Sequence, residues 1–206
     1  MIGGTLLLAT RSAGKLREIR PLLAPLGLHL LDLTEAGLPE ESDDELETGS
    51  TFEENALAKA RYYFAASGGI PTVADDSGIE VSVLEGRPGV KSKRWSGRSD
   101  LSGQALDDAN NATLIEALQG APDRTARYVC VAAFADASGE IVARGETSGT
   151  IVKQPRGTGG FGYDPYFLSD DLGVTFGEAA PEEKARVSHR GRAFRQLAER
   201  LQELGG

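Results

Sequence analysis

Residues 5–33, TLLLATRSAGKLREIRPLLAPLGLHLLDL, decide the class of fold. The apolar run at 5–9 predicts a buried strand, and residues 14–23 have the apolar spacing of a helix. Pro21 lies within that helix, so we expect the helix to bend or to end near it. Residues 28–33 predict a second strand. This order of strand, helix and strand is typical of an α/β protein.

Similar alternation continues along the chain. Residues 50–66 predict the clearest helix, because Ser50 and Thr51 are each followed three residues later by a glutamate, as in a capping box. Residues 72–74 predict a short strand before a pair of aspartates, and residues 79–84 are a weaker candidate for another strand. The remaining predicted elements are a helix over 103–118, a hairpin of strands over 126–135 and 140–152, and a closing helix over 191–204.

These elements favour one α/β domain. Apolar residues make up 40% of the 206 residues and charged residues 26%, as is usual for globular proteins. The sequence has no internal repeat and no low-complexity linker, so we expect residues 1–206 to form a single domain. Alternation at the start and a long hairpin later favour a mixed sheet over a purely parallel one.

The formal net charge is −9, and the charges are unevenly distributed. Residues 35–54 include nine acidic and no basic residues, whereas residues 86–98 include five basic and no acidic ones. For each run, an ordinary solvated surface is as good an interpretation as a binding site. An acidic protein is a poor general ligand for nucleic acid, because neutralising phosphates supplies most of that affinity. A small polyanion bound by a local basic cluster and a metal ion is compatible with this composition.

Three features bear on the compartment of the protein. The single cysteine, Cys130, excludes an intramolecular disulfide. Residues 1–5 lack the basic start and the long apolar run of a signal peptide. No stretch approaches the roughly 18 consecutive apolar residues of a membrane span. We therefore expect a cytoplasmic protein with no membrane partner.

A polar turn links the first predicted strand to the first predicted helix. Residues 10–15, TRSAGK, are expected to present backbone N–H groups and the positive end of the helix dipole to a phosphate. The side chains of Thr10, Arg11, Ser12 and Lys15 add donors. The turn is not a Walker loop, because the opening glycine is absent and a leucine follows the lysine. A strand–helix turn with incidental charges is the competing interpretation.

Two adjacent carboxylates, Asp75 and Asp76, follow the predicted strand at 72–74. Such neighbours repel each other unless a cation or hydrogen-bond donors offset their charge. Oxygen ligands of this kind favour Mg²⁺, which keeps several waters and is completed by substrate phosphates. Adjacent strand residues point to opposite faces, so we expect one aspartate to face the site while the other braces the loop. An Asx turn with Gly78 in the left-handed conformation is the competing interpretation.

The glycine-rich segment GTGGFGYDP, residues 157–165, matches G-x-G-x-x-G. A dinucleotide-binding turn is followed by a helix, whereas Pro165 and aromatic residues follow here, so we reject that function. The segment instead predicts a loop whose backbone lies against a flat ligand, with a ring for stacking and a carboxylate as an acceptor. For Tyr166 and Phe167 we expect packing in the core.

The two histidines do not suggest metal or nucleophilic chemistry. His189, beside Arg190, is more typical of an exposed loop before the last helix than of a catalytic pair, and His29 in an apolar strand is interpreted as structural. Because no second histidine clusters with either and there is one cysteine, we do not expect a zinc site or a Cys–His pair.

Six segments, taken in order, resemble the inosine triphosphate pyrophosphatase family, whose members clear deaminated purines from nucleotide pools. They are LATRSAGK, ETGSTFEENALAKA, ADDSGIEV, GRPGVKSKRWSG, GTGGFGYDPYF and EEKARVSHRGRAF. The resemblance spans nearly the whole chain. It implies an elongated α/β fold with a mixed central β-sheet flanked by helices, two lobes with the active-site cleft between them, and a homodimer.

The resemblance also implies roles for individual residues. Asp76 matches the general base and, together with Glu47, a ligand of Mg²⁺. The substrate-binding residues that it implies are Thr10, Arg11, Ser12, Ala13, Gly14, Lys15 and Lys59 at the phosphates, Ser77 beside the base catalyst, and Phe161, Gly162, Tyr163, Asp164, Lys184, His189 and Arg190 around the nucleobase. The sequence departs from the family at Ser12, where asparagine is usual, and at Lys91 and Lys93, where tyrosine and alanine are common.

The implied reaction is hydrolysis of dITP, ITP or XTP to the monophosphate and pyrophosphate. His189 and Arg190 can donate to a 6-oxo group, whereas the 6-amino group of adenine presents a second donor to them. Two alternatives stay open: a related pyrophosphatase for modified pyrimidine or methylated nucleotides, and a non-catalytic nucleotide sensor. Asp75 and Asp76 argue against the sensor, since a binding module gains little from carboxylates near phosphates.

Overall fold

The structure, a computed structural model, describes residues 4–38 and 43–205. Residues 1–3 of the N-terminal segment considered above, and residues 39–42 of the acidic run, lie outside the described residues. Within the described ranges, no helix is both long and apolar enough to cross a membrane. Cys130 is a buried free thiol.

Six strands of the described chain form one sheet in the order β2-β1-β3-β4-β5-β6. The strand β1 is parallel to both β2 and β3, whereas β5 and β6 are antiparallel, so the predicted mixed sheet is confirmed. The strands are β1 (Thr5–Leu8), β2 (His29–Asp32), β3 (Thr72–Val81), β4 (Thr125–Asp136), β5 (Gly139–Ile151) and β6 (Phe167–Ser169). Two residues join β4 to β5, which form the predicted hairpin.

The α-helices are α1 (Ala13–Leu23), α2 (Asp43–Leu46), α3 (Phe52–Ala66), α4 (Gly103–Ala117), α5 (Pro181–Val187) and α6 (His189–Gly205). The helix α1 continues past Pro21 to its last residue, Leu23, and a 3-10 turn follows. Of the two capping frames considered, Thr51 caps α3 and forms the box with Glu54. The last helix begins at His189, so this histidine and its neighbour belong to α6 and not to a loop before it.

Contacts between residues divide the chain into two compact units. The first comprises Met1–Asp76, Cys130–Gly145 and Arg190–Gly206, and the second comprises Ser77–Val129 and Glu146–His189. The strands β3, β4 and β5 each contribute residues to both units. The single domain expected from the sequence stays a prediction.

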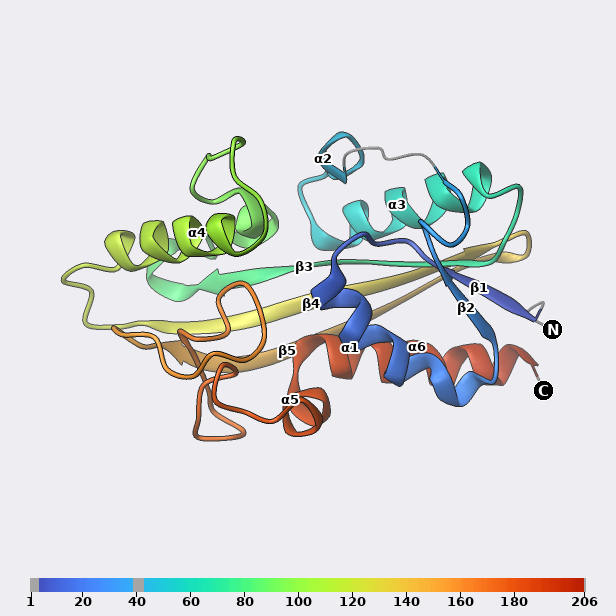
Figure 1. Cartoon of the computed structure of the whole chain (residues 1–206). Helices are drawn as coiled ribbons and strands as arrows, with labels where there is room; N and C mark the ends of the chain where they lie inside the picture. Colours follow the sequence, from blue (N-terminus) through green and yellow to red (C-terminus); the bar gives the residue numbers. More distant parts are fainter. Residues whose placement is uncertain (1–3, 39–42, 206) are drawn as a thin grey trace. The chain divides into compact units, whose positions relative to one another are not determined.

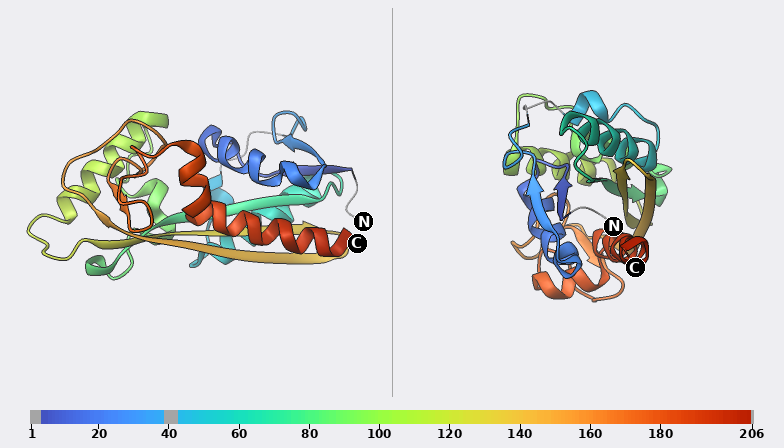
Figure 2. Two further views of the ribbon diagram at one scale, coloured as in Figure 1. Left: turned by 90° about the horizontal axis from the view of Figure 1, so that it is seen from below. Right: turned by 90° about the vertical axis from the view of Figure 1, so that its right-hand side faces the viewer.

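The first unit has helices on both faces of its strands. Figures 1 and 2 show α1 and α6 on one face and α3 on the other. Leu8 of β1 packs in one apolar core with Ile19 of α1 and with Phe194 and Leu197 of α6. These helices therefore bury their apolar stripes against the strands, which is the main source of stability in such layers.

The second unit packs α4 against the other ends of the long strands. Leu114 of α4 shares a core with Ile79 of β3 and Tyr128 of β4, and Figure 1 shows α4 on one side of these strands and α5 on the other. Phe167 lies fully buried in this core and Tyr166 packs against it partly buried, so their predicted packing is confirmed.

The strand β3 corrects the prediction for the aspartate segment. Asp75, Asp76, Ser77 and Gly78 lie inside a single ten-residue strand, Thr72–Val81, and not in a turn between two short strands. Gly78 does not have the positive φ that the competing Asx turn requires. Two buried carboxylates are tolerated within a strand because charged and amide groups from other elements reach them.

Candidate active site

The turn between β1 and α1 is ordered by its own side chains. Ser12 is the N-cap of α1: its Oγ accepts the N–H of Lys15 at 3.3 Å, and its own N–H donates to Thr10 Oγ1 at 3.2 Å. Arg11 donates through Nη2 to the carbonyl oxygen of Leu38 at 3.1 Å. No acidic residue lies in the first turn of α1, so the positive end of this helix suits an anion. The exposed or partly exposed members of the turn are Arg11, Ser12, Ala13, Gly14 and Lys15.

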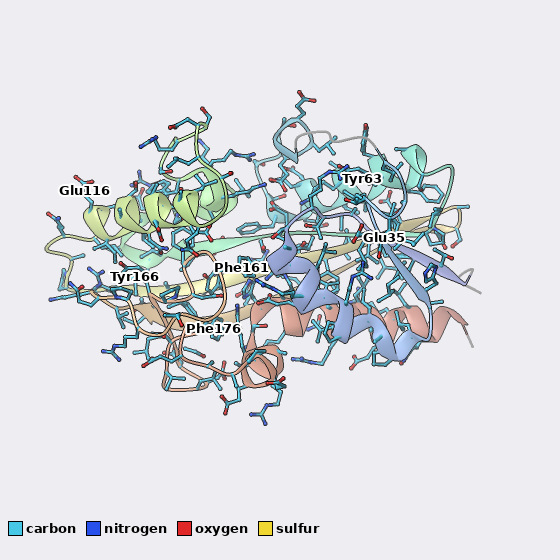
Figure 3. All side chains as sticks on the ribbon, viewed as in Figure 1. Glu35, Tyr63, Glu116, Phe161, Tyr166 and Phe176 are labelled. Carbon is cyan, nitrogen blue, oxygen red and sulfur yellow. The ribbon has the colours of Figure 1, made fainter. Side chains whose placement is uncertain are left out.

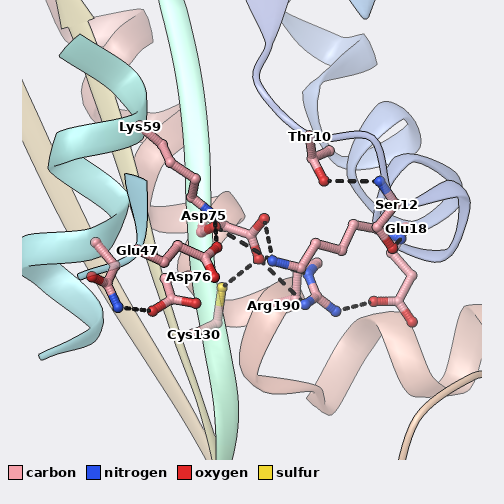
Figure 4. A network of polar contacts seen from close by, with 11 residues as sticks. Thr10, Ser12, Glu18, Glu47, Lys59, Asp75, Asp76, Cys130 and Arg190 are labelled. Carbon is pink, nitrogen blue, oxygen red and sulfur yellow. Dashed lines mark hydrogen bonds and ion pairs between the residues drawn. The ribbon is translucent and has the colours of Figure 1, made fainter. Parts of the chain in front are cut away.

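Asp75 is the centre of a group of buried ion pairs, shown in Figure 4. Lys15 Nζ lies 3.1 Å from Asp75 Oδ1, and Arg190 Nε lies 3.3 Å from Asp75 Oδ2. Arg190 also pairs through Nη1 with Glu18 of α1 at 2.6 Å. Burial acts to raise the pKa of Asp75, but the charges of Lys15, Arg190 and Lys59 outweigh it and hold that pKa well below its ordinary value. Asp75 is therefore an ionised brace between β3, α1 and α6.

Asp76, the next residue, has the opposite electrostatic setting. It is 4% exposed, and Asn55 Nδ2 of α3 donates to its Oδ2 at 2.9 Å. Burial raises the pKa of Asp76, Lys59 lowers it, and the negative charge of Glu47 raises it again, so that the net pKa lies above the ordinary value. Asp76 is thus a stronger proton acceptor than an exposed aspartate.

Asn55 and Lys59, one turn apart on α3, connect the segment carrying Glu47 to β3. Lys59 Nζ donates to Glu47 Oε1 at 2.6 Å and to the carbonyl oxygen of Asp75 at 2.5 Å. Asn55 Oδ1 accepts the N–H of Gly49 at 2.7 Å, so the Asn55 side chain bonds both the segment that carries Glu47 and the carboxylate of Asp76. A Cβ on Gly49 would lie only 2.7 Å from Asn55 Oδ1, which explains the glycine. The name carboxylate cluster is used below for Glu47, Asn55, Lys59, Asp75 and Asp76.

The carboxylate cluster has the chemistry to hold a divalent cation. Glu47 raises the pKa of Asp76, and a cation shared by the two would offset this repulsion. Within the part of the chain that the structure describes, no group of three or more His, Cys, Asp or Glu side chains is placed to hold a metal ion. Two carboxylates suit Mg²⁺, which keeps waters and takes phosphate oxygens, better than zinc, which needs three or four protein ligands.

In the second unit, a buried aspartate organises the glycine-rich segment. Asp164 is 2% exposed, and its Oδ2 accepts Lys184 Nζ at 2.5 Å and the N–H of Phe161 at 2.8 Å. Lys184 Nζ lies 5.2 Å from the ring centroid of Phe161 and 5.3 Å from that of Phe176, two rings that Figure 3 labels. A Cβ on Gly160 would collide with the carboxylate of Asp164, so glycine is required there.

His189 is buried against Tyr128 in the same unit. The two rings stack with their centroids 4.4 Å apart and an interplanar angle of 6°, and His189 is 3% exposed. The hydroxyl of Tyr128 also donates to Asp164 Oδ1 across 3.5 Å. Tyr128 therefore contacts two residues that the family resemblance implies at the nucleobase. The name aromatic cluster is used below for Tyr128, Phe161, Asp164, Lys184 and His189.

Some residues expected at the substrate also have contacts within the protein that the sequence did not indicate. Tyr163 is a core residue, 5% exposed, whose hydroxyl donates to the carbonyl oxygen of Ser92 at 2.7 Å. Arg190 pairs with Asp75 and with Glu18 of α1. Ser77 is half-buried within β3. Of the glycine-rich segment, Phe161 and Gly162 stay partly exposed.

Two site residues have no role in the sequence analysis. Asn55 was detectable, because it precedes Lys59 by four residues and therefore shares a stripe of the same helix. Tyr128 gave no signal, since an aromatic residue in an apolar strand is most often a core residue.

The fold and the two clusters define an α/β protein that combines a helix terminus suited to an anion, a pair of carboxylates and a buried lysine in one unit. The sequence profile of the Ham1 family matches residues 6–200, and the chain belongs to this family. A protein of Mycolicibacterium paratuberculosis named dITP/XTP pyrophosphatase is 49% identical to it over 202 residues, with 97% of this chain and 96% of that protein covered.

Solved structures agree with this membership. The structure of a HAM1 protein from Coxiella burnetii matches with a TM-score of 0.83 and 37% identity, over 97% of this chain and 98% of that one. A structure from Mycobacterium abscessus, titled nucleoside-triphosphatase / dITP/XTP pyrophosphatase, matches with a TM-score of 0.72 and 42% identity, over 94% of this chain and 98% of that one. The α/β fold predicted from the sequence is thereby confirmed.

Proposed function

We propose that this chain hydrolyses dITP, ITP and XTP to the nucleoside monophosphate and pyrophosphate. The names of the relatives support this reaction, and one observation in the structure carries it. Asp76, with its raised pKa, lies in one cluster with Glu47 and Lys59. This combination suits a reaction in which a carboxylate takes a proton while cations offset the charge of phosphates.

Glu47 and Asp76 would hold Mg²⁺ in this proposal. The ion would supply charge for the phosphate oxygens and lower the pKa of a bound water. Asp76 orients and deprotonates the attacking water, and Asn55 fixes the carboxylate by donating to Oδ2.

Phosphates bind along the positive residues of the first unit. The turn from Thr10 to Lys15 contributes the N-terminus of α1, and Lys59 adds a second cation. Lys59 is 1% exposed and paired with Glu47, so its ammonium is held in position before substrate arrives. Such preorganised charge is worth more in a buried site than in water. Arg190 acts here as a brace for Asp75.

The aromatic cluster binds the nucleobase. Phe161 offers a partly exposed ring for stacking, and Lys184 and His189 offer donors for the 6-oxo group that inosine and xanthosine share. The 6-amino group of adenine presents hydrogens to the same donors. A polar mismatch of this kind discriminates by roughly a hundredfold or more.

The test is pyrophosphate release from a panel of nucleoside triphosphates, with and without Mg²⁺. We expect dITP, ITP and XTP to be hydrolysed at least roughly a hundredfold more efficiently than ATP, with loss of activity when Mg²⁺ is chelated. Comparable turnover of ATP would contradict the role of the aromatic cluster. Tight binding of dITP without any pyrophosphate release would favour the nucleotide sensor instead.

The proposed enzyme is a homodimer. Closed two-fold dimers are the commonest assembly of soluble proteins, and the resemblance described above supports this state. Sedimentation velocity at micromolar concentration is expected to give a species of twice the mass of the 21.8 kDa chain. A sedimenting monomer at that concentration would contradict the dimer.

A further inference from the structure

Two side chains of helix α4 bond the backbone N–H and the backbone carbonyl of one residue in the glycine-rich segment. The N–H of Gly162 donates to Asp107 Oδ2 at 2.8 Å, and the carbonyl oxygen of Gly162 accepts from Asn111 Nδ2 at 2.9 Å. Asp107 and Asn111 are four residues apart, so they lie on one face of α4. Both backbone groups of this residue are thus satisfied by two side chains from a single turn of helix.

Both side chains reach from α4 to the loop that contains Gly162. Asn111 is 6% exposed, yet its Nδ2 points to an irregular loop and not to its own helix. Burial raises the pKa of Asp107, the N–H of Gly162 lowers it, and the net pKa lies above the ordinary value. Placing a carboxylate where burial disfavours its charge costs stability, which points to a use for the bond that it makes.

Gly162 lies between the residues that the proposed function needs. It follows Phe161 directly and has φ of +63°, a conformation that glycine adopts without strain. Asp164 Oδ2 accepts the backbone N–H of Phe161, one peptide before that of Gly162. The backbone on both sides of Phe161 is therefore held, by Asp164 at one peptide and by α4 at the next.

We propose that Asp107 and Asn111 are positioning residues that fix the ring of Phe161 and so set recognition of the nucleobase. This inference rests on the proposed function for its kinetic consequence. It deepens that function by adding two residues of α4 that act through Phe161. The two bonds from Asp107 and Asn111 to Gly162 are called the clamp below. If the clamp is lost, the ring of Phe161 samples several orientations and the affinity for the nucleobase falls, while the carboxylate cluster in the first unit is unaffected.

The chain provides a matched control in the preceding residue. Asn110 is also buried on α4, at 3% exposed, and bonds a different loop: its Nδ2 donates to the carbonyl oxygen of Lys93 at 3.0 Å, and its Oδ1 accepts the N–H of Ser96 at 2.8 Å. Asn110→Ala and Asn111→Ala remove the same side chain from neighbouring positions. A difference between them reports which loop matters.

The experiment compares Asp107→Ala, Asn111→Ala and Asn110→Ala with the wild type, after circular dichroism has established that each is folded. We expect the first two to raise KM for dITP about tenfold with kcat changed less than about threefold, as for the loss of one binding hydrogen bond. Asp107→Asn keeps an acceptor and should restore KM. Inhibition by inorganic tripolyphosphate, which has no base, should be unchanged in all variants.

A second measurement decides the clamp without relying on catalysis. Hydrogen–deuterium exchange of the peptide containing Gly162 should be faster in Asp107→Ala and Asn111→Ala than in the wild type, and unchanged in Asn110→Ala. Unchanged exchange in Asp107→Ala overturns the clamp. An equal rise of KM in Asn110→Ala, or a parallel loss of tripolyphosphate inhibition, overturns its role in base recognition. A wild type that fails to hydrolyse dITP overturns the proposed function, and exchange then decides the clamp by itself.

Discussion

The carboxylate cluster and the aromatic cluster are each built around a buried aspartate, but the two aspartates are neutralised in different ways. Asp75 is surrounded by Lys15 and Arg190, and the charge continues to Glu18. Asp164 pairs with Lys184 and also accepts the N–H of Phe161 and the hydroxyl of Tyr128. The first cluster is therefore rich in charge, as the proposed binding of phosphates and Mg²⁺ requires, whereas the second combines an ion pair with aromatic rings, as the proposed binding of a flat base requires.

The comparison predicts the largest loss of stability at Asp75. Asp75→Asn leaves the buried guanidinium of Arg190 and the ammonium of Lys15 without their shared counter-charge, which should lower the free energy of unfolding by about 3–5 kcal/mol. Urea denaturation measures it. The control is Asp32→Asn, which breaks the more exposed pair with Arg20 and should cost less than about 1 kcal/mol. Equal losses in both variants would refute the brace.

A smaller loss is expected in the aromatic cluster. Lys184→Met removes the cation from Asp164, but the carboxylate keeps the N–H of Phe161 and the hydroxyl of Tyr128. These remaining donors keep the carboxylate hydrogen-bonded, so the free energy of unfolding should fall by about 3 kcal/mol, the lower end of the range for breaking a buried ion pair. A loss as large as that of Asp75→Asn would mean that both clusters are governed by charge alone.

Lowering the pH should destabilise the protein through Asp75 of the carboxylate cluster. Because the pKa of Asp75 is lowered in the folded protein, its ionised form stabilises the fold above the ordinary aspartate pKa of 3.8, and this contribution is lost as the pH falls below that value. We expect the free energy of unfolding to fall below about pH 4, by up to about 1.4 kcal/mol per pH unit for this group. The slope should be shallower in Asp75→Asn; an identical slope would exclude Asp75 as its source.

Ser12 should give the smallest effect. Its Oγ caps α1, so Ser12→Ala should cost about 1 kcal/mol of stability, while Ser12→Asn, an equally good cap, should cost less than that. Asparagine also reaches farther towards a phosphate, and we expect it to lower KM for dITP by about tenfold. Unchanged kinetics in a folded Ser12→Asn protein would assign this residue to capping alone.

The elements were more predictable from the sequence than the contacts between them. Apolar periodicity located β1, α1, α3 and the long hairpin, because these elements bury regular stripes. It failed at β3, where Asp75 and Asp76 resemble a turn in isolation. Their partners come from far along the chain: Lys15 is 60 residues away and Arg190 is 115 residues away. No local pattern contains that compensation.

The same reason limits the prediction of site residues. Lys59 and Glu47 were named from the family resemblance, and the structure brings them together at 2.6 Å. The resemblance named Arg190 beside His189 but gave no sign of its pair with Asp75. The first turn of a helix directs adjacent side chains to different faces. The histidine therefore stacks on Tyr128 while the arginine pairs with Asp75.

We propose that the two adjacent aspartates have different roles: Asp76 takes part in catalysis and Asp75 stabilises the fold. The most direct test measures kcat for dITP and the free energy of unfolding on the same preparations of Asp75→Asn and Asp76→Asn. We predict that Asp76→Asn lowers kcat by about a hundredfold or more with stability within about 1 kcal/mol of the wild type. An Asp76→Asn protein that keeps wild-type kcat, beside a stable but inactive Asp75→Asn protein, would contradict the account.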